Sequence, residues 1–176
     1  MRLFLSTAGK MFGLIIFFLI CLNSCKNNDA STEKYPNYIG YLDPETTISD
    51  INFEICGDED IKGTHHGLPK HAYKPNKGVF DKTIRATYRN KGYTDSGYLN
   101  FRFIVNCRGE TGRYEIVQMN LGLEETTLSE DMVNQLFQLT ADKENWNGYR
   151  SKKSGINYYM YVSYKIEDGE ISEILP

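Results

Sequence analysis

The sequence contains no run of basic residues and, beyond its N-terminus, no long apolar segment. Its 20 Lys and Arg stand against 23 Asp and Glu, which gives a formal net charge of −3. Nucleic-acid-binding proteins carry a basic patch, so we expect no nucleic acid among the partners. After residue 25 no stretch approaches the about 20 apolar residues that a membrane-spanning helix requires. We therefore expect a domain that is soluble apart from its N-terminus.

The short motifs of common enzyme classes are also missing. The chain has no Gly-x-Ser-x-Gly, no His-Glu-x-x-His and no Gly-rich phosphate-binding loop. The acidic pairs Glu124-Glu125 and Glu130-Asp131 are typical of solvated loops and helix starts, and they do not by themselves supply a convergent acid and base. We therefore expect no enzymatic activity, no catalytic residues and no cofactor.

All three histidines, His65, His66 and His71, lie within residues 57–77. Such a cluster invites a metal site, because neutral imidazole is a common metal ligand. Adjacent histidines on extended backbone point apart, however, and no nearby carboxylate or cysteine has a recognisable ligand spacing. The segment is also rich in Gly, Pro, Asp and Lys, which predicts a surface loop without a metal.

The N-terminus has the features of an exported protein. Residues 11–22 form an apolar run of 12 residues behind Arg2 and Lys10, which is too short to span a bilayer and is typical of a signal peptide. It ends in Leu22-Asn23-Ser24-Cys25, which resembles a bacterial lipobox. The pattern predicts removal of residues 1–24 and lipidation of Cys25. An ordinary signal peptide with a chance cysteine, or an uncleaved anchor, are the alternatives.

The segment after Cys25 predicts a tether. Residues 26–34 are nearly all charged or small polar residues, and such a composition cannot bury enough apolar surface to order itself. Ten residues of flexible coil span about 15–20 Å, so residues 25–50 would hold the domain close to its membrane. We therefore expect a lipid-anchored protein of the cell envelope, at the outer membrane and facing the periplasm.

Cysteine use agrees with export. Cys21 would leave with the signal peptide and Cys25 would carry the lipid, so Cys56 and Cys107 remain. Two thiols in an oxidising compartment predict a disulfide, and closing a loop of about 50 residues would stabilise the fold by about 4 kcal/mol. The alternative is two buried free thiols, since free cysteine is among the most buried residue types.

Hydrophobic periodicity predicts the first elements. Residues 51–56 alternate apolar and polar side chains, which predicts a short strand before the loop of residues 57–77. A helix should begin near Gly78 and end near Lys91-Gly92, where glycine suits a C-cap. Its apolar stripe repeats at every fourth position, as on one face of an amphipathic helix, and comprises Phe80, Ile84 and Tyr88.

The second half of the chain predicts a hairpin, a helix and a closing strand. Residues 98–107 alternate strictly, residues 108–112 supply turn residues, and residues 114–120 return as the partner strand. A second helix should follow Ser129 as its N-cap. Tyr158, Met160, Val162, Tyr164 and Ile166 share one face of a further strand, before the two-residue turn Asp168-Gly169 and a short strand that holds Ile171 and Ile174.

This order predicts an α+β domain: a small antiparallel sheet of 3–4 strands with two helices packed on one face. The segment of residues 97–109, from a glycine through alternating apolar residues to a polar-Gly turn, resembles the first strand and turn of the TonB C-terminal domain. Trp146 resembles the tryptophan before that family's last strand, and residues 158–169 resemble the closing strand. The resemblance covers residues 78–176.

The chain departs from that family in the parts that deliver energy. A TonB transducer has an uncleaved inner-membrane helix and a long Pro-rich arm, whereas this chain has a lipoprotein signal and 5 prolines in total. The Tyr-Pro pair that the family often carries between helix and first strand is replaced here by Tyr93-Thr94-Asp95. The resemblance therefore implies the receptor-binding domain of a transducer without the membrane helix and the arm that connect it to an energy source.

The resemblance implies a protein-binding lipoprotein. In the TonB family an extended receptor segment adds as a strand beside the closing strand, here residues 158–166, so the partner would be a segment of an outer-membrane receptor or transporter. An accessory lipoprotein without peptide recognition, and a true energy transducer in transmembrane transport, are the alternatives. The partner-binding residues that this reading implies are Tyr158, Tyr159, Tyr161, Ser163 and Lys165.

Overall fold

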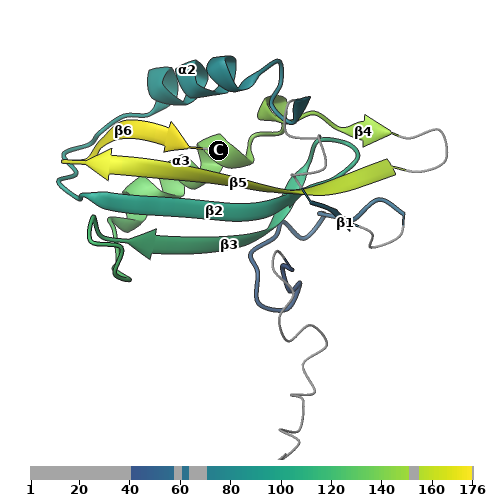
Figure 1. The fold of residues 1–176 in the computed structure, drawn as a ribbon, viewed down its shortest axis with the longest axis horizontal. Helices are drawn as coiled ribbons and strands as arrows, with labels where there is room; N and C mark the ends of the chain where they lie inside the picture. Colours follow the sequence, from purple (N-terminus) through teal and green to yellow (C-terminus); the bar gives the residue numbers. More distant parts are fainter. Residues whose placement is uncertain (1–40, 58–60, 64–70, 151–154, 176) are drawn as a thin grey trace, which may run out of the picture. The chain divides into compact units, whose positions relative to one another are not determined.

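Two long strands pair at the centre of a six-stranded mixed sheet, and two helices cover one of its faces (Figure 1). The computed structural model describes residues 41–57, 61–63, 71–150 and 155–175. The predicted signal peptide, and the tether up to residue 40, therefore lie outside the described residues. The elements are β1 (Ile61–Lys62), α2 (Lys77–Thr87), β2 (Gly97–Val105), β3 (Thr111–Met119), α3 (Glu130–Ala141), the 3-10 helix η3 (Lys143–Asn145), β4 (Tyr149–Arg150), β5 (Gly155–Glu167) and β6 (Glu170–Leu175).

The predicted class is confirmed as α+β, but the predicted sheet was too small and wrong in being wholly antiparallel. Its main order is β1-β5-β2-β3, and β4 and β6 also pair with β5. β5 runs antiparallel to β2, β4 and β6 and parallel to β1. β1 and β4 have two residues each, too short for an alternating pattern to appear in the sequence.

Both predicted helices are present, with different ends. α2 begins at the N-cap Asn76, whose side chain accepts from the Val79 amide at 3.1 Å. It ends at Thr87, before the predicted Lys91-Gly92. α3 follows Ser129 as predicted, but the Ser129 side chain makes no capping hydrogen bond. Ser129 therefore occupies the predicted N-cap position, but it does not make the side-chain hydrogen bond expected of an N-cap serine.

The core lies between the helices and the face of the sheet formed by alternate residues of β2 and β5. Trp146 is 2% exposed and donates its indole N–H to the Thr140 carbonyl at 2.7 Å, while the Thr140 hydroxyl and the Tyr164 hydroxyl are 2.7 Å apart. These bonds satisfy polar groups that burial would otherwise penalise. The buried residues of this face and its helices include Phe80, Ile84, Leu99, Phe101, Phe103, Met132, Leu136, Met160, Val162 and Ile166.

Residues 51–56 do not form the predicted strand. They belong instead to a segment, residues 48–56, that we call the strap, and that crosses the end of the sheet where β3 begins. Ile48 donates its amide to the Tyr114 carbonyl at 2.9 Å and accepts from the Tyr114 amide at 2.7 Å. The Phe53 ring lies over Gly112, where a Cβ atom would come within 2.3 Å of it, so glycine is needed there.

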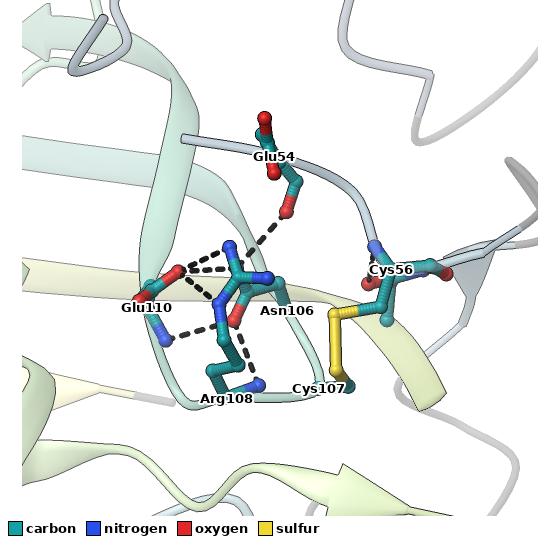
Figure 2. Close-up of a disulfide and its surroundings, with 7 residues drawn as sticks. Glu54, Cys56, Asn106, Cys107, Arg108 and Glu110 are labelled. Atoms are coloured by element: carbon teal, nitrogen blue, oxygen red, sulfur yellow. Dashed lines mark hydrogen bonds and ion pairs between the residues drawn. A yellow bond between two sulfur atoms is a disulfide. The ribbon is translucent and has the colours of Figure 1, made fainter. Parts of the chain in front are cut away.

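The strap ends in the predicted disulfide between Cys56 and Cys107 (Figure 2). The buried Asn157 amide donates to the Cys56 carbonyl at 2.9 Å, and its Oδ1 accepts from the Cys56 amide at 3.0 Å. Asn106 Nδ2 donates to the Glu54 carbonyl at 3.0 Å. One backbone bridge, one disulfide and two side-chain amides thus fasten the strap to β3, to β5 and to the turn between β2 and β3, which explains why residues 51–56 need no strand ladder.

Replacing both Cys56 and Cys107 with serine should lower the free energy of unfolding by about 4 kcal/mol, because the disulfide closes a loop with a sequence separation of 51 residues. Urea denaturation measures the change, and Cys25→Ser is the matched control because it changes a cysteine outside the disulfide. Equal stability of the double variant and the control would contradict the expectation, as would full thiol labelling of both residues in the unfolded, unreduced protein.

Candidate partner-binding surface

Three of the five predicted partner-binding residues share the face of the sheet that points away from the core. Figure 1 views the molecule from this side, with α3 behind the sheet, and no helix of the described residues covers the face. The strand register places its side chains in cross-strand rows. We call the following set the open face: Tyr98, Asn100 and Arg102 of β2, Glu115, Val117 and Met119 of β3, Tyr161, Ser163 and Lys165 of β5, and Glu173 and Leu175 of β6.

Polar groups of the open face are paired within its rows. Arg102 and Glu115 form an ion pair of 2.5 Å, and both side chains are about two-fifths exposed. The Ser163 hydroxyl donates to Asn100 Oδ1 at 2.6 Å. A surface pair of this kind contributes under about 1 kcal/mol to stability. The pairs therefore set the positions of these side chains more than they stabilise the fold.

Lys165 lies among acids at the far end of β5. Its ammonium is 3.2 Å from Glu167 and 3.7 Å from Glu173. The hydrogen bond with Glu167 raises the pKa of Lys165, and hydrogen bonds from Ser172 and Lys165 lower the pKa of Glu167. Both groups are therefore charged at neutral pH, and this corner of the open face presents a cation surrounded by carboxylates.

The five predicted partner-binding residues divide between the two faces of the sheet. Tyr161, Ser163 and Lys165 lie on the open face, and Tyr161 is 48% exposed. Tyr159 is half-buried on the same side, opposite Ile104. Tyr158 lies in the core, with no exposed surface, and its hydroxyl donates to the Asn147 carbonyl at 2.9 Å. Three of the five side chains therefore belong to the open face.

The strap covers one end of this side of the sheet. Ile104 belongs to the same face of β2 as Arg102, yet it is fully buried and is not part of the main core. It pairs with Gly112, the residue beneath the Phe53 ring. The open face therefore extends from the edge of the strap toward the end of β3.

The outer edge of β5 is largely occupied by this chain's own strands. β6 pairs with residues from Ser163 to Glu167, as the predicted turn at Asp168-Gly169 requires, and both turn residues have positive φ, at 51° and 75°. Ile171 and Ile174 anchor β6 in the core, at 8% and 6% exposed. A peptide that adds a strand here would have to displace β6.

The outer edge of β3 is also protected, which the sequence analysis did not predict. Ile48 of the strap pairs with Tyr114 near one end, and Thr126 donates its amide to the Gln118 carbonyl at 3.1 Å near the other. Covering an edge in this way is a common means of preventing unwanted strand pairing. Neither edge therefore offers a long unoccupied stretch among the described residues, whereas the open face does.

An open pocket of about 490 Å³ lies between the strap, the start of β3 and the end of α3, and its lining includes Tyr114, Phe137 and Glu110. The Glu110 carboxylate accepts hydrogen bonds from Asn106 and Arg108, which lower the pKa of Glu110 (Figure 2). This carboxylate holds the β2–β3 turn beneath the strap. The arrangement is that of a structural hydrogen-bond network around the disulfide.

Of the three histidines that suggested a metal, only His71 lies in the part of the chain that the structure describes. His71 is exposed, and its carbonyl accepts from Asn147 Nδ2 at 2.6 Å, while His65 and His66 lie outside the described residues. Over those described residues, no three His, Cys, Asp or Glu side chains form a group that could hold a metal ion. No helix there is long and apolar enough to cross a membrane.

Comparison of the chain with protein-family models, with curated proteins and with solved structures finds no match. The surface must therefore be interpreted from its own chemistry.

Substitution of Tyr158 and of Tyr161 tests the assignment of these two β5 side chains to the core and to the open face. Tyr158→Ala should lower the free energy of unfolding by about 3–5 kcal/mol, because it empties a fully buried site. Tyr161→Ala should cost under about 1 kcal/mol, because the side chain is 48% exposed. Urea denaturation of the two variants measures both changes, and similar losses would show that Tyr161 serves the fold rather than a surface.

Proposed function

We propose that this protein is a lipid-anchored lipoprotein of the cell envelope whose α+β domain holds another envelope protein on its open face. The lipobox-like Leu22-Asn23-Ser24-Cys25 supports the anchor. The Cys56–Cys107 disulfide supports an oxidising compartment, since disulfides are rare where thiols are kept reduced. The proposed place is the outer membrane on its periplasmic side.

The observation that carries the proposal is the composition of the open face. Tyrosine and arginine are enriched at protein–protein contacts, where a large side chain with few torsions gives contact area at low entropic cost. Tyr98 in one end row, and Arg102 with Tyr161 in the other, supply such side chains. Val117 and Met119 add apolar area on the neighbouring strand. A protein partner can bury these groups without separating the Arg102–Glu115 pair.

A TonB-like role is the narrower form of this proposal. In it, the partner is an extended segment of an outer-membrane receptor or transporter, and recognition would use the region around β5. β6 occupies part of the outer edge of β5, and displacing it would expose the buried Ile171 and Ile174. The partner would therefore contact the open face rather than add a strand at that edge.

An accessory lipoprotein without peptide recognition is the second candidate. The observation in its favour is that each outer edge, that of β5 and that of β3, is partly occupied by the chain itself. In that case extended peptides would not bind to the domain. The open face would either bind the surface of a folded protein or have no partner.

The lipid anchor has a direct test. Mass analysis of the protein purified from membranes should give a chain that begins at Cys25 and carries acyl groups, because the apolar run of residues 11–22 is followed by the lipobox-like motif. Cys25→Ser should abolish the acyl mass. An intact N-terminus, or cleavage elsewhere without lipid, would contradict the anchor.

The partner surface can be mapped in cells with a photo-reactive amino acid. Placed at Tyr161, on the open face, it should cross-link to one defined envelope protein. Placed at Val79, which is 39% exposed on α2 at the other side of the sheet, it should not. Purified partner should then bind Tyr161→Ala at least about tenfold more weakly than the unchanged protein. Equal cross-linking from both positions, or none from Tyr161, would argue against the proposed surface.

A further inference from the structure

The loop after β3 presents two leucines to solvent on a firmly braced backbone. Asn120 and Glu124 close it: the Asn120 amide donates to the Glu124 carbonyl at 2.8 Å, and the Glu124 amide donates to Asn120 Oδ1 at 3.1 Å. Asn120 Nδ2 also donates to the Glu124 carboxylate at 2.9 Å. Leu121 and Leu123, between them, are 47% and 65% exposed. We call residues 120–125 the leucine loop.

Leu123 occupies a backbone conformation that leucine rarely adopts. Its φ is +65°, in the left-handed region, where Cβ crowds the following carbonyl. The glycine of the loop, Gly122, stands one position earlier and is not the residue with positive φ. Glycine at position 123 would remove the crowding, and the leucine side chain is 65% exposed, so burial there offsets little of the strain. Strain of this kind at an exposed residue points to a role outside the fold.

Acidic residues follow the two leucines in the sequence. Glu124 and Glu125 follow them directly, and Glu130, at the start of α3, is exposed as well. No Lys or Arg stands between Arg113 and Lys143 in the sequence, and Lys91, which reaches the start of α3, is paired with Asp131 at 3.0 Å. An anionic membrane surface would repel this loop, whereas a protein pocket with basic residues at its rim would attract it.

The leucine loop and the strap lie at opposite ends of β3 (Figure 1). β3 has 9 residues, and at about 3.4 Å per residue it separates the two ends by about 30 Å. The Cys56–Cys107 disulfide belongs to the strap end. Met119, the last residue of β3, belongs to the open face, so the loop continues that surface at the end away from the strap.

We propose that the leucine loop is a protein-docking element, and that Leu121 and Leu123 insert into an apolar pocket rimmed by Arg or Lys on the partner. This inference rests on the proposed function, because it extends the open face by a second contact with the same envelope protein. Leucine side chains supply the buried area, and the carboxylates select a basic rim. The strained Leu123 makes the loop present its side chain before the partner arrives, which lowers the entropic cost of binding.

The experiment uses the full-length lipoprotein with a photo-reactive amino acid at position 123, in cells. The cross-linked protein is identified, purified and titrated with variants. Leu121→Ser with Leu123→Ser should weaken binding by at least about tenfold. Glu125→Gln should weaken it by a few-fold and reduce its dependence on salt. Ile51→Ser is the matched control, because Ile51 is a 96% exposed aliphatic residue on the strap, and it should leave binding unchanged.

Leu123→Gly separates docking from folding. It should raise the melting temperature by about 2–5 °C, because it relieves the left-handed strain, and yet weaken binding. Lower stability of this variant would contradict the strain argument and, with it, the inference.

The remaining outcomes are equally decisive. Cross-linking of position 123 only to lipid, or only to a second copy of this chain, would overturn the inference. If the partner loses affinity for Tyr161→Ala but keeps it for the leucine variants, the loop proposal fails and the proposed function stands. If neither position 161 nor position 123 captures a protein, both fail.

Discussion

The antiparallel pairing of β5 with β2 is the contact on which the rest of the structure depends. The register runs without a break from Gly97 opposite Ile166 to Val105 opposite Tyr158. Because side chains alternate along a strand, a slip of one residue would turn every core residue outward. The pairing therefore decides at once that Phe101 and Tyr164 pack under the helices and that Arg102 and Tyr161 face away from them.

The strap adds a second constraint, at one end of the sheet only. It needs Gly112 beneath Phe53 and Gly155 beside the disulfide, where a Cβ atom would lie 2.4 Å from that of Cys107. The strap is thereby fixed to one end of the sheet, while β6 and the leucine loop occupy the other.

Much of the fold follows from residue patterns that are strong and local. The alternation in β2 and β5, the four-residue stripe of Phe80 and Ile84, and the turn at Asp168-Gly169 each predicted an element that is present. The disulfide was predicted from the oxidising compartment and from the number of cysteines that remain after Cys25, not from any pattern around Cys56 and Cys107.

What the sequence did not reveal depends on contacts between distant residues. β1 and β4 are too short to carry a period, and the partner of β1 lies far along the chain, at Asn157 and Tyr158. Residues 51–56 alternate like a strand, but side-chain amides and a disulfide hold them instead, and Ile51 is 96% exposed. Tyr158 was predicted to contact a partner although its own alternation places it in the core, and the left-handed Leu123 has no signature in the sequence.

The most direct test of the central claim, that the domain binds through its open face, is a backbone amide NMR titration of the folded domain with extended peptides from outer-membrane receptors and with the cross-linked partner. The account predicts that the partner shifts amides along β2, β3 and β5 together, centred on Arg102 and Tyr161. Shifts confined to the outer edge of β5 with release of β6, or confined to the outer edge of β3, would contradict it.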